Sequence, residues 1–155
     1  MDILKLLEED HKRIVQKINR LPGSLLKARQ NLDALLSLSE DLEKELSRHE
    51  KIEDLVFFPA LQGKVSDQSL QSLMDEHNES KKVRDLFMTA IAEIKSLGNH
   101  SPPEKIKEMS GHGYKLMRIL STHFTREDQL LFPIAKSILT KEQSEDLWKQ
   151  TQAYL

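Results

Sequence analysis

One segment of this chain occurs twice, and that repeat constrains the fold more than any other feature. Residues 49–60 (HEKIEDLVFFPA) align with residues 123–134 (HFTREDQLLFPI). Both segments begin with histidine, carry Glu-Asp as their fifth and sixth residues, and continue into an apolar stretch that ends in Phe-Pro. A weaker match pairs Asp10-His11 with Glu76-His77. The repeat therefore predicts two related helical hairpins, each with a lone histidine followed by an HxxxE pair.

Apolar residues recur at helical spacing through most of the chain, and breakers separate the periodic stretches. The breakers are Leu21-Pro22-Gly23-Ser24, the Pro59 to Gly63 region and the 99–103 loop. We expect helices over about residues 4–21, 35–56, 66–97 and 112–130, and a short tail helix over about 141–153 that docks through Leu147 and Trp148. This pattern predicts an all-α fold, an up-down-up-down antiparallel four-helix bundle with a short C-terminal helix.

Composition narrows the class of protein further. The 155 residues suit one domain, which we place over residues 1–155. The formal net charge of −2 gives no electrostatic signature of nucleic-acid binding, and no apolar run is long enough for a membrane span. The chain has no cysteine, which excludes thiolate metal sites and iron–sulfur clusters and fits a cytoplasmic location. Any metal must be bound by His, Asp or Glu.

The two HxxxE pairs have the spacing of a metal-binding helix face. Residues i and i+4 lie one turn apart on the same face, so His49 with Glu53, and His123 with Glu127, each present an imidazole and a carboxylate together. This mixed ligand set suits iron or manganese, and zinc also accepts it. Because a carboxylate has two oxygens, each glutamate can bridge two metals. With the lone histidines included, the pattern predicts a roughly symmetric dinuclear site.

The positions of the turns test whether the four histidines lie at one level. In an antiparallel bundle, the turn between two ligands at one level falls midway between them. The second and third histidines have their midpoint at Gly63, and the third and fourth at position 100, inside the 99–103 loop. The first two have it at position 30, whereas the breaker is Pro22-Gly23. Either the first helix bends at Pro22 and continues, or an irregular segment of about eight residues covers that end.

A metal-free polar layer is the competing interpretation of these residues. A lone histidine on an apolar helix face is usually a hydrogen-bonded core residue, but a buried carboxylate is costly unless it is paired or bound to metal. Two glutamates on inward-facing helix stripes therefore favour a metal site over a metal-free polar layer. Of the other histidines, we expect His100 to be solvated in its loop. His112 lies about 16 Å from His123 along the helix, too far to join the same centre.

The order His…HxxxE…His…HxxxE resembles the hemerythrin-like, HHE cation-binding family over about residues 4–138. The resemblance implies an up-down bundle that holds two Fe ions in an oxo- or hydroxo-bridged di-iron centre. Carried over by position, the family ligands are the terminal residues His11, His49, His77 and His123 and the bridging residues Glu53 and Glu127.

The sequence departs from the oxygen-carrying members of that family. Those carry HxxxH on the third helix, whereas the corresponding residue here is Leu73, so one iron lacks a nitrogen donor. Glu50 is a candidate replacement, because the iron-sensing hemerythrin-like domain of an F-box protein uses a glutamate there; it is equally well explained as a surface residue. Asp128 is the alternative to Glu127 as the last carboxylate. By resemblance, Leu120 lines the small-ligand pocket together with Leu73.

These departures weaken the case for a reversible oxygen carrier. We expect a di-iron protein that binds or senses a small diatomic ligand, O2 or NO. The alternative is an enzyme that acts on peroxide or nitric oxide at the same site, or supplies iron for repair; the sequence leaves both open. A ferritin-like oxidase would need two ExxH motifs, of which only Glu8 to His11 is present. A zinc peptidase would need histidine where Glu53 stands.

Overall fold

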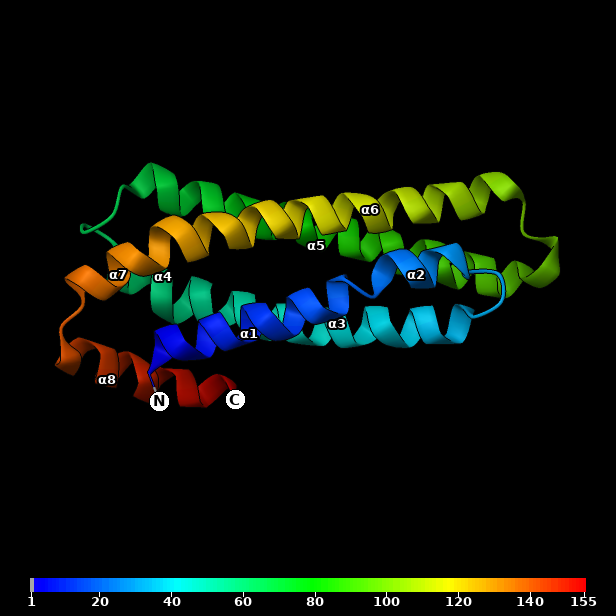
Figure 1. The fold of residues 1–155 in the computed structure, drawn as a ribbon. Helices are drawn as coiled ribbons and strands as arrows, with labels where there is room; N and C mark the ends of the chain where they lie inside the picture. Colours follow the sequence, from blue (N-terminus) through cyan, green and yellow to red (C-terminus); the bar gives the residue numbers. More distant parts are fainter. Residues whose placement is uncertain (1) are drawn as a thin grey trace.

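The computed structural model describes residues 2–155, and its long helices run alternately up and down in a bundle (Figure 1). Four rods make up the bundle: α1 (Ile3–Ile18) with α2 (Leu21–Leu26), α3 (Leu32–Ile52), α5 (Asp67–Leu97) and α6 (Pro103–Arg126). The expected all-α, up-down-up-down fold is confirmed. No helix in residues 2–155 is both long enough and apolar enough to span a membrane.

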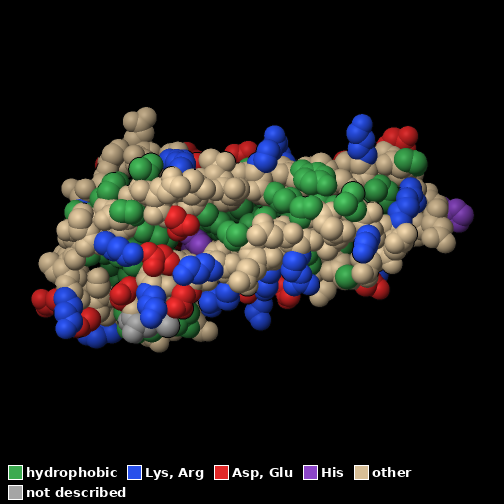
Figure 2. All heavy atoms as spheres, in the orientation of Figure 1, with side chains coloured by type: hydrophobic (Ala, Val, Ile, Leu, Met, Phe, Trp, Pro, Cys, Tyr) green, Lys and Arg blue, Asp and Glu red, His purple; other side chains and the backbone are tan. Residues whose placement is uncertain are grey.

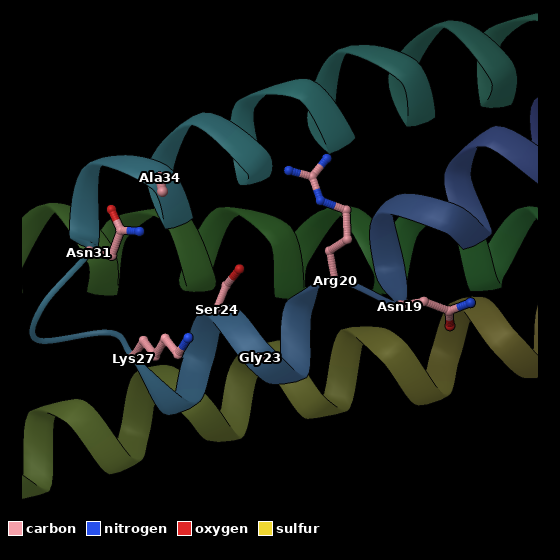
Figure 3. A pocket seen from close by; sticks show the side chains of 7 residues that line it. All are labelled: Asn19, Arg20, Gly23, Ser24, Lys27, Asn31 and Ala34. Atoms are coloured by element: carbon pink, nitrogen blue, oxygen red, sulfur yellow. The ribbon is translucent and has the colours of Figure 1, made fainter.

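The first rod is interrupted and then continues. Helix α1 ends at Ile18, and α2 begins at Leu21 with Pro22 in its first turn. Proline is tolerated there because the first turn of a helix has no partner for its N–H, whereas further along a helix it would break the hydrogen-bond ladder. The chain then turns over residues 27–31, which includes the expected midpoint at position 30. Figure 3 shows the hollow beside this interruption, with Arg20 and Ser24 pointing from the first rod toward α3.

The other two turns lie where the sequence predicts them. Gly63 adopts φ 76° in the turn before α5, a conformation that glycine reaches without steric cost. The Ser66 side chain caps α5 by accepting a hydrogen bond from the Ser69 amide, 3.3 Å away. At the other end of α5, Gly98 (φ 59°) opens the short 3₁₀ turn η2 (Gly98–His100) before α6.

Both HxxxE helices widen into a single π-helical turn that begins at the glutamate. These turns are η1 (Glu53–Phe57) and η3 (Glu127–Leu131), and each leads into a short helix, α4 (Phe58–Leu61) or α7 (Phe132–Ile138). A proline follows at the second residue of each short helix, where its ring would clash with the carbonyl four residues upstream in a regular α-helix. Widening by one residue avoids that clash, so the prolines reshape the helices instead of ending them. Such π-bulges often occur at functional sites.

The apolar core is divided into two clusters. One extends from Ile14 and Leu46 toward the α2 end, and the other from Leu7 and Ile52 toward the chain termini. The tail helix α8 (Lys141–Thr151), followed by η4 (Gln152–Tyr154), covers the second cluster with Leu147, as expected from its apolar stripe. A polar layer lies between the two clusters.

Candidate metal centre

Six ligand-type side chains fill this polar layer, and each is at most 4% exposed. One comes from each of α1 and α5, and two come from each of the rods that carry HxxxE. These are the residues named from the sequence: His11, His49, Glu53, His77, His123 and Glu127.

The six side chains form two groups of four whose ligand atoms lie within 4.8 Å of one another. The first group holds His11 and His49, with their Nε2 atoms 3.1 Å apart. The second holds His77 and His123, with their Nε2 atoms 3.0 Å apart. Both groups contain the two glutamates. The arrangement has the form of a binuclear metal site with two shared carboxylates.

Each shared carboxylate divides its oxygens between the two groups. The oxygens of Glu53 lie 3.4 Å from His49 Nε2 and 3.1 Å from His77 Nε2. Those of Glu127 lie 2.9 Å from His123 Nε2 and 3.0 Å from His11 Nε2. All four oxygens are buried and lack a hydrogen-bond donor of good geometry. Buried carboxylate oxygens without donors are costly, so this layer is suited to hold cations.

The other ring nitrogen of every histidine contacts a second carboxylate. Asp128 lies 2.7 Å from His11 Nδ1, Asp54 2.9 Å from His77 Nδ1, and Glu76 2.5 Å from His123 Nδ1. Asp10 lies 3.4 Å from His49 Nδ1. An outer carboxylate of this kind accepts the Nδ1 proton, which orients the ring and leaves the Nε2 lone pair directed at the metal position.

Charge balance explains the protonation of the metal-free layer. Burial alone would lower the pKa of His49, but Glu53 and Asp10 outweigh it and raise that pKa to about 10. Burial likewise opposes a raised pKa at His77, yet the neighbouring carboxylates of Asp54 and Glu53 bring it to about 11. Burial would raise the pKa of Glu53, but His49 and His77 hold it well below its usual range. Without metal, imidazole protons thus compensate the buried carboxylates, a task that metal cations would take over.

The remaining predicted site residues fall outside the two groups. Asp128 contacts His11 as an outer carboxylate, which leaves Glu127 as the inward residue of that pair. Both carboxylate oxygens of Glu50 accept hydrogen bonds from the Arg84 guanidinium, with N–O distances of 2.8 and 3.0 Å. Leu73 and Leu120 are buried in different apolar clusters, one on each side of the layer, and their role in a small-ligand pocket stays a prediction.

The sequence interpretation did not assign the outer carboxylates Asp10, Asp54 and Glu76. Their signal was present in the repeat, since an acidic residue precedes each lone histidine and follows each HxxxE glutamate. Phe58 packs beside the site, as its place after the HxxxE motif predicts, with its ring 5.6 Å from the His77 ring between centroids. Phe124 was not assigned from the sequence; its ring stacks on the His11 ring at 4.2 Å.

One side of the centre approaches the surface. A hollow of about 420 Å³ is lined by His11, Asp128, Lys12, Glu8 and Val15. In Figure 2, a purple histidine is visible between charged side chains, where α1 meets the rod formed by α6 and α7. The His11 ring is thus the part of the layer that borders this hollow.

The comparison with protein families agrees with this geometry. Residues 2–135 match the hemerythrin HHE cation-binding domain. The chain belongs to this family. A curated relative, the zinc finger protein BRUTUS of Arabidopsis thaliana, is 27% identical over 105 residues, which cover 66% of this chain. The match spans only 8% of that much longer protein. This hemerythrin-like chain therefore resembles one segment of BRUTUS.

Proposed function

We propose that this hemerythrin-like protein binds two iron ions through His11, His49, His77, His123, Glu53 and Glu127, and uses them to bind or sense O2 or NO. The observation that carries the proposal is the set of four buried glutamate oxygens, each facing a histidine Nε2 and none with a proper hydrogen-bond donor. Imidazole with carboxylate is a donor set that iron accepts readily.

The protein donors leave room for a further ligand at each metal position. Each group supplies two imidazole nitrogens and one oxygen from each shared glutamate, so four protein donors face each position. Iron commonly takes more ligands than four, and its open positions are where exogenous molecules bind. When bound, iron supplies a redox-active Lewis acid that takes up small molecules. The apolar surroundings, including Leu73 and Leu120, favour a small neutral molecule such as O2 or NO over a large or charged one.

Carboxylate and aromatic side chains around the centre position the ligand histidines. Asp54 and Asp128 each link a lone histidine of one hairpin to the other hairpin, so the relative placement of the hairpins and the ring orientations are tied together. The Phe58 and Phe124 rings hold the lone histidines by stacking and exclude water from their faces. These contacts preorganise the ligands before metal arrives.

Metal analysis with spectroscopy tests the proposal. Protein from iron-supplemented cells should contain about two irons per chain, with near-ultraviolet charge-transfer bands that bleach on anaerobic reduction. Restored or altered bands on exposure to O2 or NO support a carrier or sensor, whereas sustained turnover of peroxide would support an enzyme instead. Background iron that His49→Ala does not change would overturn the site itself.

A further inference from the structure

Arg84 on α5 is buried, with 2% of its surface exposed, and has no part in the metal centre described above. It is the only buried cation of the lysine and arginine type in residues 2–155. Its guanidinium donates to Glu43 at 2.6 Å, to Ser80 Oγ at 2.6 Å, and to both oxygens of Glu50 at 2.8 and 3.0 Å. Burying an arginine for stability alone is inefficient, because apolar residues of similar volume often serve as well.

The partner carboxylate stands next to the metal ligands. Glu50 directly follows His49, and only 12% of its side chain is exposed. Along α5, His77, Ser80 and Arg84 occupy one face at helical spacing, and the guanidinium reaches back to Ser80, one turn from His77. The Glu50 side chain has three rotatable bonds, so its carboxylate changes direction readily once its partner is lost.

We infer that Arg84 is a positioning residue that holds the Glu50 carboxylate away from the metal between His77 and His123, and so keeps a coordination position free for an exogenous ligand. The inference rests on the proposed function. Two hydrogen bonds to a guanidinium fork occupy both carboxylate oxygens, and Glu43 fixes the fork from the other side. Released from this clamp, Glu50 would compete with the incoming ligand for the metal.

A double-mutant cycle with sodium azide as the probe separates this role from a structural one. Azide is titrated into the ferric, iron-loaded protein, and its affinity is read from the charge-transfer absorption. Arg84→Met should weaken azide binding by about tenfold, because the freed Glu50 blocks the position. The same change should weaken binding by less than about twofold when Glu50→Gln is also present, because an amide is a poor iron ligand. Iron content is measured for every variant.

Two further variants control for misfolding and for the loss of an arginine elsewhere in the bundle. If Arg84→Met does not fold, Arg84→Lys carries the same cycle, since a lysine cannot hold both carboxylate oxygens as a guanidinium does. Arg29→Met, which removes an arginine that donates to the Ser101 carbonyl at the far end of the bundle, should leave azide affinity unchanged.

The outcomes are distinct. Unchanged azide affinity in the Arg84 variants at full iron loading overturns the inference, as does a loss that Glu50→Gln does not rescue. If the unaltered protein holds two irons, either result refutes the positioning role of Arg84 and leaves the proposed function standing. If the unaltered protein binds no iron pair, the proposed function fails and this inference fails with it.

Discussion

The first hairpin (α1 to α4) supports its HxxxE histidine with Asp10, and the second (α5 to α7) supports the equivalent histidine with Glu76. The aspartate is one methylene shorter and remains 3.4 Å from His49 Nδ1, whereas the glutamate reaches His123 Nδ1 at 2.5 Å. Asp10 is almost fully buried and receives hydrogen bonds from Arg13 and Arg48. The Glu76 side chain is 23% exposed and accepts a hydrogen bond from a single arginine, Arg126.

The hairpins also differ in their helices. The first rod is broken into α1 and α2, whereas α5 runs unbroken for 31 residues and packs along α6. The repeated motif thus places the same inward ligands in both halves, but the surroundings that tune them are unequal. We expect the two metal positions to differ in affinity for this reason.

Removing a shared carboxylate should empty both metal positions together, despite the differences between the halves. Glu53→Gln is expected to reduce metal from about two per chain to background, because each of its oxygens serves one position, whereas His49→Ala should leave about one. Elemental analysis of the purified variants measures this, with Glu79→Gln on the exposed face of α5 as the matched control. Two metals retained by Glu53→Gln would show that the glutamate is not shared.

Removing the outer carboxylates should expose the difference between the halves. Glu76→Gln is expected to lower metal affinity by about 10–100-fold, and Asp10→Asn by less, because Asp10 lies farther from its histidine. Competition with a chelator gives both affinities, and Asp75→Asn beside Glu76 controls for a charge change on the same helix. The reverse order would mean that the buried Asp10, which accepts from two arginines, matters more than its distance from His49 indicates.

Metal-free protein should lose stability as the pH rises. The neighbouring carboxylates of Glu127 and Glu76 overcome burial and raise the pKa of His123 to about 9, and the pKa of His77 is about 11. Stability from a raised histidine pKa is complete below the unfolded value of about 6.5 and disappears above the folded value. The free energy of unfolding should therefore fall by at least about 1 kcal/mol between about pH 7 and pH 9.

Urea denaturation of chelator-treated protein measures this dependence. Iron-loaded protein is the control, and it should lack most of the loss because the metals replace the imidazole protons. A metal-free protein that is equally stable at both pH values would show that the imidazoles are neutral in the layer.

The smallest effect concerns the contact between the halves. A Cβ on Gly113 of α6 would lie 3.0 Å from both Leu25 of α2 and Phe87 of α5, whereas a Cβ on Gly111 meets nothing within 4 Å. Gly111→Ala should stabilise the fold by about 0.5–1 kcal/mol. Gly113→Ala should lack this gain or destabilise by up to about 2 kcal/mol, because the contact is already tight. Denaturation midpoints measure both, and equal stabilisation would mean that Phe87 yields freely.

Helix spacing was enough to predict the inward residues. A histidine and glutamate four residues apart must share a helix face, and the positions of Gly63 and the 99–103 loop are sufficient to put three of the four histidines at one level. The level of the first histidine depended on whether the first rod continued as a helix past Pro22, and the local sequence allowed either answer. In the structure the rod does continue: after a short interruption at residues 19–20, helix α2 extends it to Leu26.

The outer residues were not predictable in this way, because their partners are distant in the chain. Asp128 contacts His11 across 117 residues, and Arg84 holds Glu50 across 34. From the sequence, Glu50 was as plausible a metal ligand as a surface residue; in the structure it is largely buried and both of its oxygens accept hydrogen bonds from Arg84.

Local periodicity and side-chain chemistry thus specify the bundle, its turns and the kinds of ligand it carries, since these depend on residues within one or two helical turns. The pairing of each histidine with its carboxylate, the clamp on Glu50 and the inequality of the two halves arise only when four rods pack together, because each depends on the distance between side chains that the chain itself keeps far apart.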